Sequence, residues 1–246
     1  VSDRRGKVGD GNTVCDYDPE EIRRKASISA AVAPLEWKNK KINLLDAPGL
    51  FDFEGGMMEA KISRNTKETR IELLLSNDKR ERSLDIGCGF LSHMLDLLCH
   101  RAALGVSIKA RGDIEVDYHH LSEDIGIAMG QALRKIAGAA PIRRYGSALL
   151  PMDGSLARVA LDFSGRGGLW WRGEFPSQRC GDFDMELVPE FFTGFAREAG
   201  LTLHIALLEA DNSHHAAEAV FKGVGLALKE ALVPAEVDPS TKGLWL

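Results

Sequence analysis

The sequence predicts an α+β fold made by internal duplication, in which two similar halves each run strands, helix, strands, helix. One observation is a repeated motif, because the stretch HHLSE at residues 119–123 returns as HHAAE at residues 214–218. A second is that the match continues downstream, where Gly130 corresponds to Gly225 and Arg134 to Lys229. A third is that segments of strand and helix periodicity surround both copies in the same order.

The composition is that of an ordinary globular protein. The chain has 246 residues, 44% of them apolar and 27% charged, which is enough for a large core in one or two domains. A net charge of -5 gives no support to a nucleic-acid or membrane-surface partner. No apolar run approaches the ~20 residues of a membrane span. The scattered cysteines favour reduced thiols and a cytoplasmic location; they are Cys15, Cys88, Cys99 and Cys180.

Residues 1–57 differ in character from the rest. Asp18-Pro19 is typical of a helix start, and residues 41–45 favour a strand that runs into Asp46-Ala47-Pro48-Gly49. This region resembles the switch region of elongation-factor-G-like translational GTPases. In that family a DxPG motif helps to hold magnesium and sense the γ-phosphate, and Ala47 stands here where threonine is usual.

A working GTPase needs a phosphate-binding loop as well. The pattern GxxxxGK[ST] occurs nowhere in the chain, and the family's guanine-reading motif is missing too. We therefore expect residues 1–57 not to bind GTP. They are interpreted as a fused, non-homologous N-terminal extension that is poorly ordered and non-functional.

The first half is expected to span residues 60–145. Strand composition occurs at both ends of residues 60–75, and an amphipathic helix is predicted from Leu91 to about Ala103. Alternating patterns predict strands at residues 106–110 and 114–118. The second of these strands leads into His119, whose helix runs through Ile136 and ends near Gly138.

The second half is expected to span residues 146–246. Strands are predicted at residues 147–150, 157–163, 169–171 and 201–205, with turns at residues 151–154 and 164–168. A helix is predicted at residues 185–199, with apolar residues on its core face. Asn212 and Ser213 are suitable N-caps for a helix that begins with the second histidine pair and continues through Lys229.

The repeated motif predicts metal binding. If each copy opens a helix, the glutamate shares a face with the first histidine at spacing four or with the second at spacing three. Neighbouring histidines diverge by about 100° around a helix, so the two imidazoles of one pair cannot easily hold one ion. The two copies therefore favour at least two ion positions, and imidazole with carboxylate suits Mn, Fe, Zn or Ni.

Longer motifs extend the argument. The strings GCGFLSHMLD, HHLSEDIGIAMGQAL, IRRYGSALLPMD and DFSGR are similar to those of imidazoleglycerol-phosphate dehydratase, from about residue 60 to the C-terminus. This resemblance implies a ribosomal protein S5 domain 2-like fold and the dehydration of imidazole glycerol phosphate to imidazole acetol phosphate in histidine biosynthesis. It also implies two Mn2+ ions per active site, placed between subunits of a homo-oligomer of 24 copies.

The resemblance also assigns individual residues. Its metal-ligand set is His93, His119, His120, Glu123, His204, His214, His215 and Glu218. Its contacts to the substrate and its phosphate are Arg144, Arg166, Lys222, Ser240 and Lys242, together with Glu68 as a candidate base. Proton transfer is thus expected from Glu68, or from a metal-bound water at the ligands Glu123 and Glu218. Lys222 also lies four residues after Glu218, so an ordinary helical ion pair is open to it.

Four positions depart from the family pattern. Ser92 replaces an aspartate, Glu115 and Tyr118 replace histidine and aspartate before the first pair, and Gly154 replaces a glutamate. None is an expected ligand, but such neighbours of ligands can change metal affinity. Two alternatives therefore stay open, a catalytically impaired metal-binding shell protein of the same fold and, from residues 1–57, a translational GTPase fragment.

Overall fold

The computed structural model describes residues 31–37, 40–46, 58–77 and 81–235, and the chain divides into two units, Val1–Gly56 and Met57–Leu246. In the first unit the described residues form an antiparallel hairpin of β1 (Ala31–Trp37) and β2 (Lys40–Asp46). Strand β2 confirms the strand predicted at residues 41–45. The predicted helix start at Asp18 and residues 47–49 of the DxPG motif lie outside the described residues.

The second unit contains two four-stranded sheets with the same topology. The strands of the first sheet are, in spatial order, β3 (Glu59–Asn65), β4 (Thr69–Ser76), β6 (Gly105–Gly112) and β5 (Arg82–Asp85). The strands of the second sheet are β7 (Tyr145–Met152), β8 (Ser155–Phe163), β12 (Leu201–Glu209) and β9 (Gly168–Arg172). In each sheet only the last pair is parallel, so the predicted duplication and the α+β class are confirmed.

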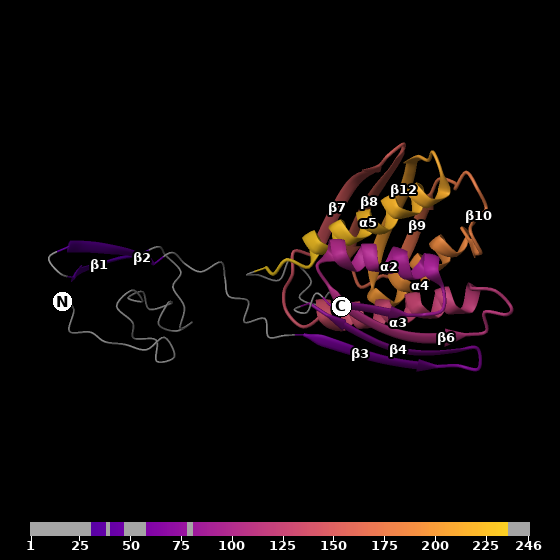
Figure 1. Cartoon of the computed structure of the whole chain (residues 1–246), viewed down its shortest axis with the longest axis horizontal. Helices are drawn as coiled ribbons and strands as arrows, with labels where there is room; N and C mark the ends of the chain where they lie inside the picture. Colours follow the sequence, from indigo (N-terminus) through magenta and orange to yellow (C-terminus); the bar gives the residue numbers. More distant parts are fainter. Residues whose placement is uncertain (1–30, 38–39, 47–57, 78–80, 236–246) are drawn as a thin grey trace. The chain divides into compact units, whose positions relative to one another are not determined.

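Four helices lie between the two sheets (Figure 1). They are α2 (Gly89–Ala102), α3 (His119–Ala137), α4 (Leu187–Ala199) and α5 (Ser213–Ala231). Helix α2 of the first half packs on α5 of the second, and α3 packs on α4. The two halves therefore share one core, and each repeated helix has a partner from the other half.

Close helix packing explains the repeated glycines. A Cβ at Gly130 would lie 2.5 Å from the carbonyl oxygen of Phe195 on α4, and a Cβ at Gly225 would collide with the carbonyl of Leu98 on α2. Since only glycine permits this approach, the downstream identity of the two motif copies is a packing requirement. The core between the helices also buries aromatic side chains of α4 and α5, namely Phe191, Phe192, Phe195 and Phe221.

The outward faces of the two sheets differ in chemistry. On the first sheet the exposed strand positions are mostly charged or polar, among them Lys61, Arg70 and Lys109. On the second sheet they include large apolar side chains, with Tyr145 56% exposed, Leu149 63% and Trp170 51%. Only the second sheet thus presents a surface that favours burial against another molecule.

The predicted strand at residues 114–118 is wrong. The chain leaves β6 at Gly112 and turns, with the backbone N–H of Val116 donating to the carbonyl of Asp113 at 2.8 Å. Ile114 and Val116 are 46% and 68% exposed, so their alternation with acidic residues reflects no buried sheet face. This turn also lies directly before His119, where the chain must change direction to begin α3.

Three described cysteines, Cys88, Cys99 and Cys180, are free thiols, as predicted. Burial raises the pKa of the Cys99 thiol to about 12, which makes it unreactive. A short hairpin of β10 (Arg179–Cys180) and β11 (Phe183–Asp184) precedes α4. None of the described helices is long and apolar enough to cross a membrane.

Candidate metal centre and active site

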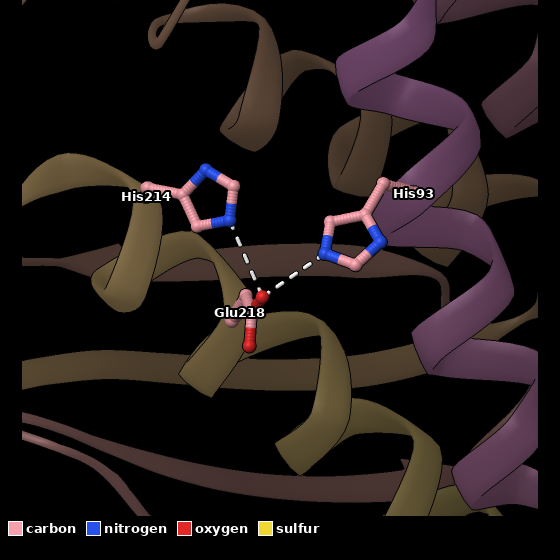
Figure 2. Close-up of side chains that lie close together, drawn as sticks. All are labelled: His93, His214 and Glu218. Atoms are coloured by element: carbon pink, nitrogen blue, oxygen red, sulfur yellow. Dashed lines mark hydrogen bonds and ion pairs between the residues drawn. The ribbon is translucent and has the colours of Figure 1, made fainter.

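The first candidate metal group joins α2 and α5. Asn212 is the N-cap of α5, since its side chain accepts a hydrogen bond from the backbone N–H of His215. One helical turn later, an oxygen of Glu218 lies 3.2 Å from Nε2 of His214 and 3.0 Å from Nε2 of His93 on α2 (Figure 2). The three side chains converge on one point and could hold a metal ion together.

Glu218 is suited to be an ionised ligand. Burial acts to raise its pKa, but hydrogen bonds from Lys222 and His93 and the charge of Lys222 outweigh it, so the pKa of Glu218 falls to about 2. Lys222 forms the helical ion pair with Glu218 that its spacing allowed, and its Nζ also lies 3.3 Å from the sulfur of Met152. The carboxylate is therefore charged throughout the physiological range.

The second candidate group is on α3 and α4. It contains His119 and Glu123, which use the same four-residue spacing, together with Glu190 of α4. The sequence reasoning missed Glu190 because its position depends on the packing of α3 against α4. Its only local signal is an acidic residue in the first turn of α4, which equally fits an interaction with the helix dipole. This group has one imidazole, whereas the first group has two.

The second histidine of each pair points elsewhere, as predicted. The rings of His119 and His120 meet at 86°, and those of His214 and His215 at 84°. Nδ1 of His120 lies 2.9 Å from Asp113, and Nδ1 of His215 lies 2.6 Å from the Asn212 amide and 3.3 Å from Asp211. These neighbours orient each ring through Nδ1, while Nε2 of His215 lies 3.4 Å from a carboxylate oxygen of Asp153.

The contacts between these rings and their carboxylate neighbours shift pKa values on both sides. The hydrogen bond to Asp113 is the main cause that raises the pKa of His120. The pKa of Asp211 is lowered to about 2, mainly by the hydroxyl of Ser155 and, against a smaller effect of burial, also by His215. Glu68 lies at the turn between β3 and β4, with an oxygen 4.0 Å from Nε2 of His120. The candidate base is thus beside one of the expected ligands.

His204 is separate from both groups. It is an exposed residue of β12, whose neighbours Leu203 and Ile205 are buried against the helices. Because side chains alternate along a strand, the imidazole lies on the outward face of the second sheet. Helix α5, which carries His214 and His215, packs on the other face of that sheet.

The expected phosphate contacts have internal partners here. Arg144 donates two hydrogen bonds to Asp162, at 2.6 and 3.1 Å, and its backbone has a φ of 75°. Arg166 lies in the turn after β8, where Nη1 donates to the carbonyl of Ser164 at 3.3 Å. Ser240 and Lys242 lie outside the described residues.

The four departures from the family pattern fit the structure. The hydroxyl of Ser92 donates to the carbonyl of Cys88 at 2.7 Å, and Glu115 lies in the turn before α3. Tyr118 donates to Asp182 at 2.8 Å, which is the main reason that its pKa rises to about 12. A Cβ at Gly154 would lie 2.9 Å from the Cβ of Asp211, so glycine there leaves room for the partner of His215.

The chain is similar to known proteins in two separate parts. The family model of imidazoleglycerol-phosphate dehydratase matches residues 86–228, and that of the elongation factor Tu GTP binding domain matches residues 1–65. Imidazoleglycerol-phosphate dehydratase of Xanthobacter autotrophicus is 51% identical over 193 residues, covering 76% of this chain and 98% of that protein. The protein of the same name from Cereibacter sphaeroides is 47% identical, covering 76% of this chain and all of the relative.

Solved structures agree with these relatives. The crystal structure of imidazoleglycerol-phosphate dehydratase from Staphylococcus aureus superposes with a TM-score of 0.67 at 38% identity, covering 72% of this chain and all of that one. A Pyrococcus furiosus structure of the same enzyme gives a TM-score of 0.66 at 35% identity, covering 74% of this chain and 99% of the other. Both resemblances drawn from the sequence are confirmed.

Proposed function

The chain belongs to the imidazoleglycerol-phosphate dehydratase family, and on that premise we propose how its own residues hold the metal and the substrate. The enzyme is a hydro-lyase of histidine biosynthesis that converts imidazole glycerol phosphate to imidazole acetol phosphate with loss of water. The observation that carries the proposal is the convergence of His93, His214 and Glu218 from two helices.

The donor sets fit a divalent transition metal. Imidazole nitrogen with carboxylate oxygen, and no thiolate, is a set that Mn2+ accepts, and the pKa of Glu218 keeps its carboxylate charged without a metal. We assign one Mn2+ to the group of His93, His214 and Glu218 and a second to the group of His119 and Glu123. When bound, such ions act as Lewis acids that stabilise negative charge on the substrate's imidazole ring.

His204 completes a ligand set only if more than one copy of the chain contributes, and we propose the same for His120 and His215, whose rings are nearly perpendicular to those of His119 and His214. His204 projects from the sheet face opposite α5, so the ion it binds must belong to another molecule. The group of His119, with a single imidazole, needs that extra nitrogen most. The outward face of the second sheet carries His204 together with the exposed apolar side chains of Trp170, Tyr145 and Leu149, and would be buried by such a neighbour. This supports a homo-oligomer, for which the family resemblance suggests 24 copies.

The chain's own residues would bind and deprotonate the substrate. We assign the phosphate to Arg144, Arg166, Lys222, Ser240 and Lys242, although the internal partners of the first three must rearrange or be shared when it binds. Glu68 is beside Nε2 of His120 and is the proposed base for the C–H proton on the second carbon from the imidazole ring. That proton and the hydroxyl on the carbon attached to the ring together leave as water, and the enol that forms becomes the ketone of imidazole acetol phosphate.

Residues 1–57 are proposed to take no part in this reaction. They match a GTP-binding family, but the chain lacks the loop that cradles phosphates in that family. We therefore propose that they bind no GTP. The cytoplasmic location likewise stays a prediction from the free thiols.

The proposal is tested by metal removal and return. Chelation should abolish dehydration, and Mn2+ should restore it with two ions per active site by elemental analysis. His119→Ala and Glu218→Ala should each lose turnover and one bound ion. Normal turnover and metal content in both variants would remove these ligand assignments.

A further inference from the structure

Trp170 holds the imidazole of His204 in a defined plane. The two residues are register partners on the parallel strands β9 and β12, and their rings stack with centroids 5.0 Å apart and planes at 11°. On the other side, the register partner of His204 is Ala160 of β8, whose small side chain leaves that face of the ring open. The imidazole is thus supported on one side and accessible on the other.

The stack is the one contact that fixes this ring within residues 58–77 and 81–235. No hydrogen bond or ion pair reaches either of its nitrogens there, unlike His120 and His215, which have carboxylate or amide partners. An exposed imidazole without such a partner would rotate freely about its side-chain bonds. The indole, which is itself 51% exposed and has no role in the core, removes much of that freedom.

We propose that Trp170 is a positioning residue, which sets the plane of the His204 imidazole so that a ring nitrogen is presented to a metal ion held by a second copy of the chain. The inference rests on the proposed role of His204 as a ligand and adds the residue that orients it. Because the stack orders the His204 ring before the ion arrives, less side-chain entropy is lost when the ring binds the ion.

The test uses the full chain with Mn2+ as the probe. Trp170→Phe keeps an aromatic face, Trp170→Ala removes it, and His204→Ala removes the proposed ligand. Trp171→Phe is the matched control, because Trp171 is the next residue of β9 and contacts Phe175 and the carbonyl of Gly173 instead. Mn2+ affinity and stoichiometry by calorimetry, indole fluorescence during the titration, and kcat and KM are measured for each.

We expect Trp170→Ala to weaken Mn2+ binding by about two- to tenfold at the affected ion, and Trp170→Phe to bind normally. Paramagnetic quenching of indole fluorescence by Mn2+ should decrease in Trp170→Phe and persist in Trp171→Phe. If Trp170→Ala binds Mn2+ like the parent while His204→Ala loses an ion, the positioning role is wrong and the ligand assignment stands. If His204→Ala itself loses no ion, the proposed ligand role fails first.

Discussion

Glu218 shows how one residue can be prepared for metal binding by its surroundings. It is buried, which by itself opposes ionisation, but Lys222 and His93 more than offset that effect. A ligand that is charged before the metal arrives gives up no proton on binding. The pairing with His214 follows from a spacing of four residues on one helix, which is why it could be predicted from the sequence.

Replacing that charge should weaken metal binding specifically. Glu218→Gln is nearly isosteric, so we expect an intact fold but Mn2+ affinity lower by at least about 10- to 100-fold, with a matching loss of kcat/KM. Calorimetry with Mn2+ and a turnover assay measure the two effects. Glu81→Gln, at an exposed position, is the control. Equal Mn2+ affinity in Glu218→Gln and the parent would contradict the assignment.

Asp211 predicts a pH dependence of stability. Its pKa of about 2 in the folded chain lies below the ordinary 3.8, so its ionised form favours folding. That contribution is complete above about pH 4 and is lost as the pH falls toward 2. Asp211→Asn should therefore lower the free energy of unfolding of the metal-free protein near pH 6, and the difference from the parent should shrink on acidification. Urea unfolding at several pH values measures this, and a constant difference would refute it.

Other site residues could not be predicted from the chain order. Glu190 lies beside His119 because α4 packs on α3. Asp113 lies beside His120 because the chain turns at residues whose alternating pattern had predicted a strand. Neither contact follows from a helical spacing. His93 and His204 were named by family resemblance alone, and the structure places the first beside Glu218 and the second on an outward face.

At the scale of elements, the repeated helices depend on close approach to partners from the other half. The helices themselves were predictable, since their apolar periodicity and the Asn212 cap are local features. Which helices pack together across the two halves could not be predicted, because that depends on which helix faces meet in the core. Gly130 and Gly225 are the residues in the sequence that this close packing requires.

Adding a methyl group at either glycine should separate the helices. We expect Gly130→Ala and Gly225→Ala each to lower the free energy of unfolding by about 1–3 kcal/mol, since the new Cβ meets a backbone carbonyl. Gly89→Ala is the control, because a Cβ there meets nothing within 4 Å. Chemical denaturation compares the three. If Gly130→Ala were more stable than the parent, as expected at an open helical position, the two helices would be able to move apart without cost.

At the scale of the whole molecule, the dehydratase match covers 98% of the Xanthobacter autotrophicus relative, whereas residues 1–65 match the model of the elongation factor Tu GTP binding domain. A chain that begins near residue 58 should therefore keep the turnover, the Mn2+ content per subunit and the number of subunits per particle of the full chain. Light scattering after size exclusion and the turnover assay measure this. Dissociation of the shortened chain would give the N-terminal segment a role in assembly.

The central claim is that the metal centre is shared between copies, and subunit mixing tests it most directly. His204→Ala and His119→Ala are each expected to be inactive, because each removes one side of every shared site. When the two variants are co-expressed as one assembly, about a quarter of the sites should combine an intact His204 with an intact His119 and regain turnover. Mixed assemblies that stay inactive, although each variant assembles normally, would contradict a site built from two copies.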